Sequence, residues 1–253
     1  MTYKSSSGAL ASKISRMVNL SPADRDQLSG LCTGVRTVRR QTVLREAGHD
    51  LDHLLCVEYG WLLSYVALPD GRRQVLQICL PGDLVGFSDI VSGDSSTDVR
   101  SLTAATVSLI PRTALRRLTD GHSNRMLAVL AGLSMQEQLA SADRIRVLGR
   151  MNAREKLVHF LMCLYSRLDR IGAVRDNGFD FPLTQFDIAD AIGLTNVSVS
   201  NMLSALHADG IIRRTNGYIE IIDFDYMRDT AHFIDRHARL DLSWLGDEAR
   251  ASA

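Results

Sequence analysis

The stretch from Thr184 to Asp209, TQFDIADAIGLTNVSVSNMLSALHAD, predicts two short helices joined by a tight turn. Thr184 is followed three residues later by Asp187, a spacing typical of a helix N-cap that satisfies the free amides of the first turn. Gly193 suits the left-handed residue that ends a helix, and Thr195 can cap the next one. The apolar positions of the second helix follow the spacing i, i+3, i+4, i+7, at Val199, Met202, Leu203 and Leu206.

The face of the second helix opposite these apolar positions carries small polar side chains. Two helices joined in this way form a helix-turn-helix, a motif that places its second helix in the major groove of DNA. Small polar side chains on that helix can reach base edges there. We therefore expect double-stranded DNA as a partner, and a DNA-facing set made of Thr184, Thr195, Asn196, Val197, Ser198, Ser200 and Asn201.

The residues that follow predict a β-hairpin. The segments 211–214 and 218–221 flank Asn216 and Gly217, a dipeptide typical of tight hairpin turns. A hairpin directly after a recognition helix makes a winged helix, with Arg213 and Arg214 available to DNA phosphates. The alternative is an ordinary helical pair in some other core, with both arginines merely solvated. The consecutive order of helix, turn, helix and hairpin favours DNA binding.

The charge balance supports a different class of function. The chain has 29 basic and 29 acidic residues, and the segment 195–209 contains no Lys or Arg. Neutralisation of DNA phosphates normally supplies much of the affinity of a protein for DNA. Because the recognition helix has no basic residue, this neutralisation must come from Arg150, Arg154, the wing and the helix N-terminus at Thr195. The alternative function is a ligand-sensing or protein-interaction module whose helix-turn-helix has lost DNA reading.

Composition excludes several other classes of protein. The 253 residues suffice for two domains, no apolar run approaches the length of a membrane span, and the N-terminus lacks a signal-peptide pattern. Four single cysteines without a Cys-x-x-Cys pair fit free thiols in a cytoplasmic protein. Catalytic motifs are absent from the sequence, so we expect neither catalytic residues nor a metal site, and no membrane partner. The cysteines are Cys32, Cys56, Cys79 and Cys163.

The first half of the chain predicts an antiparallel β-roll, which gives an α+β fold class overall. A Ser-rich arm (1–20) and a short helix beginning after Ser21 precede a series of short strands separated by turn residues. Regularly spaced short strands are typical of such a roll or barrel. The predicted strands are Val38–Leu44, His53–Tyr59, Trp61–Leu68, Arg73–Cys79 and Val107–Ile110.

A long helix is predicted over 112–149, and its length favours a dimer seam over a buried core element. Two further helices are predicted, at Ala153–Ile171 and near Phe224–Leu240. The apolar stripe of the long helix is Leu127, Leu130, Leu133, Leu139, Ile145 and Leu148. The predicted organisation is an arm (1–20), a β-roll sensor (21–118), a dimerisation helix (119–149), a winged-helix domain (150–240) and a tail (241–253).

The β-roll, long helix and winged helix together resemble the Crp/Fnr family of bacterial transcription regulators. Leu80–Phe87, LPGDLVGF, resembles the Fnr branch, and the segments 150–160 and 181–209 resemble its FixK-like members. The resemblance implies a homodimer that binds an inverted repeat near promoters, with the β-roll as sensor and RNA polymerase as a partner.

The cyclic-nucleotide-binding members of that family place a Gly-Glu pair at Gly86 and Phe87 and an Arg-Ser pair at Ser95 and Ser96. Without that Glu and Arg, the ribose and the cyclic phosphate lose their partners, so we do not expect cAMP in its usual pose. These four positions are the effector-pocket candidates. A cyclic-nucleotide regulator with an unusual pocket is a third reading of the sequence.

The oxygen-sensing Fnr members hold an iron–sulfur cluster through N-terminal cysteines and one cysteine of the β-roll. Residues 1–31 contain no Cys, and Ser108 stands at the β-roll position, so we do not expect that cluster. No cofactor is predicted. Haem, another small effector, a redox-sensing thiol or no effector remain open alternatives.

The family's recognition helix often carries a Glu-x-x-Ser-Arg pattern. Aligned through Gly193, this chain has Val197, Ser200 and Asn201 at those positions and retains only the Ser. Asn pairs with adenine where Arg prefers guanine, and Val can contact a thymine methyl. We therefore predict a half-site that differs from the usual Fnr sequence.

Overall fold

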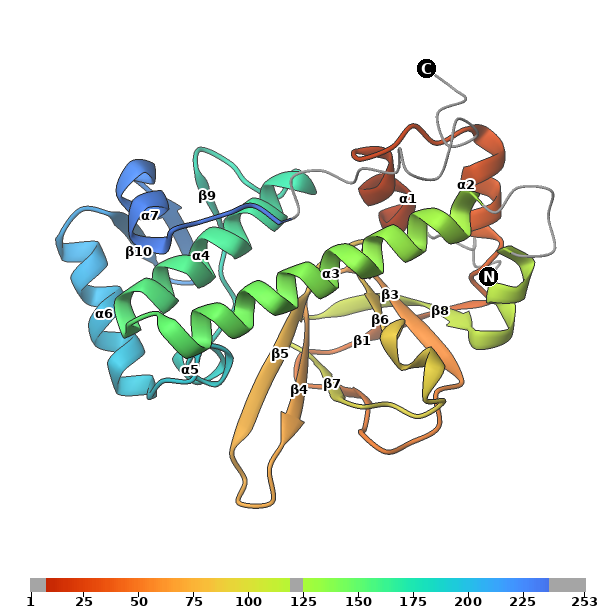
Figure 1. Cartoon of the computed structure of the whole chain (residues 1–253), viewed down its shortest axis with the longest axis horizontal. Helices are drawn as coiled ribbons and strands as arrows, with labels where there is room; N and C mark the ends of the chain where they lie inside the picture. The colour runs from red at the N-terminus through yellow and green to blue at the C-terminus, as the bar shows by residue number, and fades with distance from the viewer. Residues whose placement is uncertain (1–7, 119–124, 237–253) are drawn as a thin grey trace. The chain divides into compact units, whose positions relative to one another are not determined.

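The computed structural model describes residues 8–118 and 125–236, which divide into two compact units (Figure 1). The first contains the described residues up to Val66 together with Gln77–Gln138. The second contains Ala67–Leu76 and the described residues from Leu139 onward. The helix α3 (Arg125–Arg150) runs through the boundary between them.

Two four-stranded sheets form the β-roll, in the orders β1-β8-β3-β6 and β2-β7-β4-β5. The pairs β1–β8, β3–β8, β3–β6, β2–β7 and β4–β7 are antiparallel, as the sequence predicts. Val57, Leu62 and Val107 are fully buried in a cluster drawn from both sheets. The strands are β1 Gly34–Val38, β2 Val43–Arg45, β3 His53–Tyr59, β4 Leu62–Ala67, β5 Arg73–Cys79, β6 Leu84–Val85, β7 Asp98–Ser101 and β8 Ala105–Pro111.

The prediction of one strand over Val38–Leu44 is wrong. The chain ends β1 at Val38, turns, and begins β2 at Val43 in the other sheet. Gln41 takes a positive φ of 65° in this turn, and its amide donates to the Ser101 carbonyl at 2.9 Å. The sequence between Val38 and Leu44 gives no local signal that the chain crosses from one sheet to the other here.

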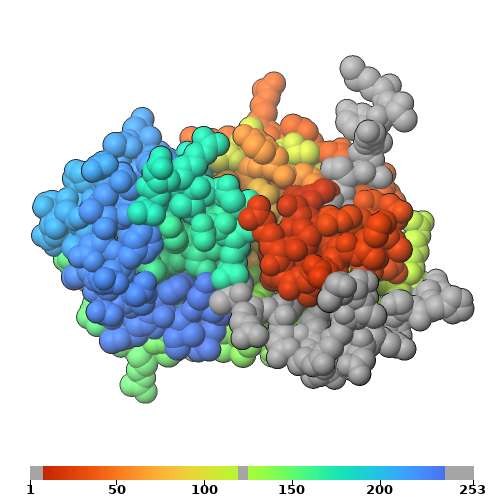
Figure 2. Space-filling model, turned by 90° about the horizontal axis from the view of Figure 1, so that it is seen from above, coloured from red at the N-terminus to blue at the C-terminus, as the bar shows by residue number. Residues whose placement is uncertain are grey.

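The expectation of a loose arm over 1–20 is wrong for the part that the structure describes. Gly8–Ser15 forms helix α1, whose Leu10 and Ile14 are fully buried in a core with Leu54. Figure 2 shows this N-terminal segment as part of the surface of the first unit. Helix α2 (Pro22–Ser29) begins at the predicted cap, where the Ser21 side chain accepts from the Asp24 amide.

Helix α3 divides its apolar positions between two faces, which differs from the single stripe that the sequence predicts. Leu130 is buried in the core of the first unit, and Leu127 and Leu133 pack against it. Leu139 and Ile145 are 59% and 73% exposed. The predicted helix also begins too early, because Arg112–Leu118 forms the 3₁₀ helix η2, and 119–124 lie outside the described residues.

The second unit contains the predicted winged helix. Its elements are α4 Ala153–Arg170, β9 Gly178–Asp180, α5 Gln185–Ile192, α6 Asn196–Ala208, β10 Ile212–Thr215, β11 Tyr218–Ile221 and α7 Phe224–Ala231. The wing is a three-stranded sheet in the order β10-β11-β9. Strand β9 was not predicted, and it follows a tight turn at Asp176 and Asn177, both with positive φ. Helix α7 ends at Ala231, earlier than predicted, and 237–240 lie outside the described residues.

Candidate DNA-binding interface

Local side-chain bonds fix the two helices of the helix-turn-helix. The Thr184 hydroxyl accepts from the Asp187 amide, and the Asp187 carboxylate accepts from the Thr184 amide, both at 3.1 Å. Gly193 has φ 67° and ψ 44°, and its amide closes α5 onto the Ala189 carbonyl. The Thr195 hydroxyl accepts from the Ser198 amide at 3.2 Å. The caps and the left-handed turn predicted from the sequence are confirmed.

Helix α6 is anchored by one apolar face. Val199, Leu203 and Leu206 are fully buried, and Met202 is half-buried beside them. Burying three such side chains stabilises the unit by several kcal/mol, at about 1.5–3 kcal/mol each. The anchored face leaves the opposite face of α6 pointing away from the core of the unit.

The outward face of α6 presents a mixed set of polar and apolar side chains. Thr195, Val197 and Asn201 are exposed, and Asn196 and Ser198 are half-buried. Val197 is 62% exposed, so its apolar side chain is accessible to a partner. Within the described residues, the Asn201 amide side chain has no hydrogen-bond partner.

Besides Thr195 and Ser198, whose hydroxyls bond to each other at 2.9 Å, two more of the predicted DNA-facing residues make bonds inside the protein. The Ser200 hydroxyl accepts from Gln185 Nε2 at 3.1 Å and ties α6 to the start of α5. The Thr184 hydroxyl donates to Asp187 Oδ2 at 2.7 Å within the cap. Both side chains therefore position the helices, whereas Val197 and Asn201 are free to meet a partner.

The wing arginines differ in their surroundings. Arg213 Nη1 lies 2.7 Å from Glu220 Oε2, directly across the β10–β11 pair, although its side chain is 62% exposed. Arg214 is exposed, and its guanidinium has no partner among the residues described. Arg214 therefore carries a full positive charge, whereas the charge of Arg213 is partly neutralised by Glu220.

Arg154, a candidate phosphate ligand from the sequence, is engaged inside the unit. Its Nη2 lies 2.8 Å from Asp209 Oδ2, its Nε donates to the Tyr226 hydroxyl at 2.7 Å, and its guanidinium stacks 5.5 Å from the Tyr226 ring. The hydrogen bond to Asp209 raises the pKa of Arg154, which keeps the pair ionised. These long-range partners were not evident from the sequence.

His207 links the end of α6 to the wing, a role that sequence reasoning missed. Its Nδ1 lies 3.3 Å from the Ile212 carbonyl oxygen and 3.4 Å from the Arg214 amide nitrogen. The contact places the first residues of β10 beside the helix that precedes them. A polar side chain at the last turn of a recognition helix, directly before the wing, is the signal that could have indicated it.

Three of the four predicted effector-pocket residues, Phe87, Ser95 and Ser96, are engaged in contacts within the first unit. Phe87 packs against the core of the first unit, and the Ser95 hydroxyl is buried and donates to the Thr97 carbonyl at 2.8 Å. The Ser96 hydroxyl donates to Asp89 Oδ1 at 2.7 Å. The Ser95 and Ser96 hydroxyls therefore donate to acceptors of their own loop. They do not fit a cyclic phosphate in the usual pose. Gly86 has φ 88°, a backbone conformation that favours glycine.

The thiols do not gather into a cluster. Cys32, Cys56 and Cys79 are buried, and in the described ranges no group of three or more Cys, His, Asp or Glu is placed to hold a metal ion. Burial raises the pKa of Cys163 to about 12, so this side chain is a thiol at neutral pH. The residues present therefore do not fit an iron–sulfur cluster, which needs several thiolates.

Cys163 belongs to a hydrogen-bonded chain between α3 and α4. Its sulfur lies 3.4 Å from His159 Nδ1, and His159 Nε2 lies 3.3 Å from Asp143 Oδ2. Burial lowers the pKa of His159, although Asp143 opposes that effect. Burial alone would raise the pKa of Asp143, but the hydrogen bond and charge of Arg146 lower it overall.

The depressed pKa of His159 predicts acid sensitivity. The unfolded chain binds a proton at His159 below about pH 6.5 more readily than the folded chain does, so stability falls as the pH falls through that value. In urea unfolding at about pH 7.5 and about pH 5.5, we expect His159→Gln to show a smaller stability difference than the parent. His49→Gln, at a ring whose side chain is 70% exposed, is the control. An unchanged difference in His159→Gln would show that His159 does not carry the effect.

Two family models match this chain. A family model described as a Crp-like helix-turn-helix domain matches residues 155–230, and one described as a cyclic nucleotide-binding domain matches residues 35–122. Within the described residues, no helix combines the length and apolarity that a membrane span requires.

Several relatives match over most of their length. The Anaerobic regulatory protein of Haemophilus influenzae is 29% identical over 207 residues, covering 81% of this chain and 79% of that protein. The Fumarate and nitrate reduction regulatory protein of Escherichia coli K12 is 28% identical over 215 residues, covering 84% of each.

Solved structures show the same architecture. FixK2 from Bradyrhizobium japonicum superposes with a TM-score of 0.69 at 26% identity, covering 78% of this chain and 96% of that one. TTHA1359 from Thermus thermophilus, a CRP/FNR family regulator, superposes with a TM-score of 0.61 at 16% identity, covering 79% of this chain and 99% of that one, and supports the fold alone. With both domains in family order and an anchored, capped recognition helix, this chain belongs to the Crp/Fnr family of DNA-binding transcription regulators.

Proposed function

We propose that the chain acts as a homodimer on an inverted-repeat promoter site, with one α6 in each of two major-groove half-sites. The observation that carries this proposal is the outward face of α6, where Val197 and Asn201 are exposed above a fully buried apolar base. The contacting set remains as the sequence predicts, with Thr184 and Ser200 acting through helix placement. We place the protein in the cytoplasm, with RNA polymerase as a further partner and with no catalytic role.

The exposed face of α3 supports the homodimer. Met135, Leu139 and Ile145 are 51%, 59% and 73% exposed, and Ala142 lies on the same face. The steps of four, three and three residues keep these positions close to one helical seam. Large apolar side chains exposed along one face of a long helix are typical of a surface that a second helix covers.

The domain division predicted from the sequence is part of the proposal. The β-roll (21–118) would sense a signal, α3 would pair the protomers, and the winged helix (150–240) would read DNA. Because Ser95 and Ser96 are engaged in their own loop, the sensor would not hold cAMP through a phosphate contact at those positions. A signal would act by changing how the two winged helices are oriented.

Selection from a random duplex library with reduced, ligand-free protein at low salt tests the function. Enrichment of an inverted repeat would establish DNA reading and define the half-site. We expect adenine and thymine where Asn201 and Val197 reach the bases, which differs from the usual Fnr half-site. If the library, offered with and without cell extract, yields no enriched sequence, the proposed function is wrong.

A second candidate function is an interaction module without DNA reading. It is supported by the lack of Lys and Arg over 195–209 and by the internal pairing of Arg154 and Arg213. Salt dependence separates the two functions, since phosphate contacts weaken steeply as salt rises and a protein-binding surface need not.

Arg214 and Arg213 make a matched pair for this test. We expect Arg214→Ala to reduce the slope of log affinity against log salt concentration by about one unit per protomer, and so by about two units for the dimer, because each neutralised phosphate contributes about one unit. Arg213→Ala should reduce the slope less, because Glu220 already neutralises part of its charge. Equal slopes in the parent and Arg214→Ala would show that the wing does not contact phosphate. The slopes are measured by fluorescence anisotropy on the selected duplex.

A further inference from the structure

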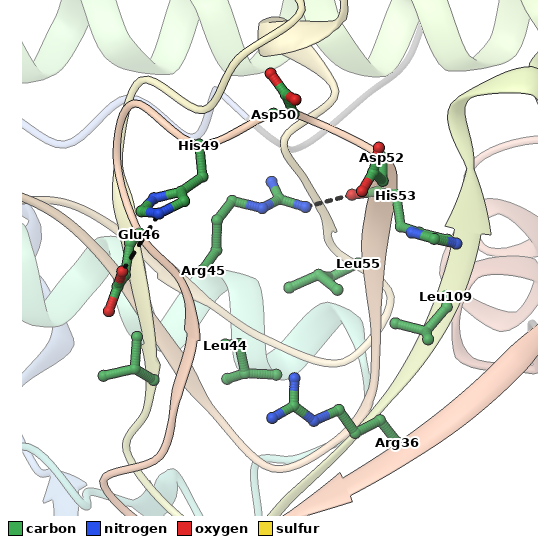
Figure 3. A pocket seen from close by; sticks show the side chains of 11 residues that line it. Arg36, Leu44, Arg45, Glu46, His49, Asp50, Asp52, His53, Leu55 and Leu109 are labelled. Carbon is green, nitrogen blue, oxygen red and sulfur yellow. Dashed lines mark hydrogen bonds and ion pairs between the residues drawn. The ribbon is translucent and has the colours of Figure 1, made fainter.

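The cavity of the β-roll, within the first unit, has a lining of mixed charge. Its volume is about 470 Å³, and Leu44, Leu55 and Leu109 supply apolar surface among arginines, histidines and carboxylates (Figure 3). Arg45 Nη1 is buried against Gly86 without a hydrogen-bond partner in the described residues, so this nitrogen is not open to the cavity. The mixed lining therefore favours no one class of ligand.

The wing contains a reactive dipeptide, Asn-Gly, which occurs twice in the chain. Asn216 and Gly217 form the turn between β10 and β11, whereas Asn177 and Gly178 stand at the start of β9. Strand β11 begins directly after Gly217 and pairs with Gly178 near its other end. The two copies therefore lie at opposite ends of the same sheet.

The chemistry of this dipeptide is spontaneous deamidation. The glycine amide nitrogen attacks the side-chain carbonyl carbon of Asn, and its proton leaves with the side-chain amine as ammonia, which closes a succinimide ring. Water then opens the ring at either carbonyl and gives aspartate or isoaspartate. Glycine has no Cβ to hinder this attack. The reaction needs water and a glycine amide that is accessible and free of a hydrogen bond.

The structure leaves the amide at the wing turn open. Asn216 and Gly217 are exposed, and among the described residues neither the Asn216 side chain nor the Gly217 amide has a hydrogen-bond partner. Gly217 has φ 74°, and a Cβ atom built there would meet no atom within 4 Å. The surrounding fold therefore does not hinder the Gly217 nitrogen from reaching the Asn216 side chain.

The second dipeptide is closed at the corresponding atom. Gly178 is buried, and its amide donates to the Arg175 carbonyl at 2.8 Å. Tyr218 covers it, since a Cβ atom built at Gly178 would overlap the Tyr218 hydroxyl group, which donates to the same Arg175 carbonyl at 2.9 Å. This turn must open before the Gly178 nitrogen can attack Asn177, and opening breaks a buried hydrogen bond.

We propose that Asn216 is a site of spontaneous deamidation and that its conversion weakens DNA binding by the wing. The product carries a negative charge two residues from Arg214, and isoaspartate adds one carbon to the backbone of the turn. Negative charge on a surface that meets phosphates opposes binding. The effect on DNA rests on the proposed function, whereas the deamidation does not. The affinity for DNA would fall with the age of the protein molecule.

Peptide mapping by mass spectrometry tests the site on the full chain, incubated without DNA in warm, mildly alkaline buffer. We expect Asn216 to convert at least about tenfold faster than Asn177, because the Gly178 amide is free only when its turn opens. Incubation in urea is the control, since unfolding removes the protection and should bring the two rates together. Similar rates in the folded chain, faster conversion at Asn177, or an intact Asn216 while the unfolded chain converts would overturn the proposal.

Fluorescence anisotropy on the selected duplex tests the effect on DNA. Asn216→Asp should weaken binding about tenfold, because each of the two wings gains a charge that offsets about one phosphate contact. Asn177→Asp is the matched control, since it adds the same charge to an exposed turn at the other end of the sheet and should bind like the parent.

Incubation supplies a second comparison. It should lower the affinity of the parent but not that of Asn216→Gln, because the longer Gln side chain closes the corresponding ring far more slowly. Equal affinity of Asn216→Asp and the parent, or an equal loss in incubated Asn216→Gln, would overturn the effect on DNA. The mass spectra involve no DNA, so the site can hold even where the proposed function fails.

Discussion

Replacing Asn201 by alanine is expected to weaken binding to the selected duplex by about 1–3 kcal/mol for each half-site, or about 5- to 150-fold per half-site. Asn201 is exposed on the outward face of α6, and its amide has no hydrogen-bond partner in the described residues. A side-chain amide that is free and held on a rigid helix can form two hydrogen bonds with adenine. The loss should relax selection at one base pair of each half-site and leave the others unchanged.

The measurement is a binding titration combined with a repeat of the library selection on the variant. Asn201→Arg should shift the preferred base at the same position toward guanine. Ser204→Ala is the matched control, because Ser204 is exposed farther along α6, whereas recognition helices read bases with their N-terminal residues. A half-site that is identical for the parent and for Asn201→Ala would exclude Asn201 from base reading.

Replacing Leu139 by arginine is expected to convert the dimer to a monomer and to weaken DNA binding about 100-fold or more. Leu139 is 59% exposed on α3 between Met135 and Ala142. The substitution therefore places a charge in the proposed seam and does not change the packing in the core of either unit. Each half-site would then be held by one winged helix alone, which removes the gain in effective concentration that a dimer provides.

Sedimentation equilibrium and DNA titration together test the seam. Val91→Arg is the matched control, since Val91 is an apolar side chain that is 92% exposed and lies outside α3. The control variant should unfold at the temperature of the parent, whereas Leu139→Arg should unfold at a lower temperature, because association no longer stabilises its folded state. If Leu139→Arg remains a dimer, the exposed face of α3 is not the seam.

The winged helix could be predicted from the sequence because its signals are local. The cap formed by Thr184 and Asp187 and the left-handed Gly193 act within a few residues, so they need no knowledge of the rest of the fold. The register of the hairpin could also be predicted from the position of its turn. With Asn216 and Gly217 at the turn, pairing backward places Arg213 opposite Glu220, and the ion pair follows.

Other features depend on partners far along the chain. Leu10 and Ile14 are only one apolar pair in a Ser-rich start, and their burial depends on a core that includes Leu54. The split of α3 into a buried and an exposed face follows from where the first unit ends. The engagement of Arg154 by Asp209 and the orphan nitrogen of Arg45 likewise arise only when distant elements meet.

The internal ion pairs of the second unit have a consequence for how the protein searches a chromosome. Sliding along DNA depends on sequence-independent attraction to phosphates. With Arg154 held by Asp209, Arg213 held by Glu220 and a net charge of zero, this attraction is weak. We expect little of the protein to be sequestered on bulk DNA and most of it to stay free in solution. Promoter occupancy therefore follows the number of protein molecules in the cell closely, and a small change in synthesis or degradation becomes a regulatory signal in itself.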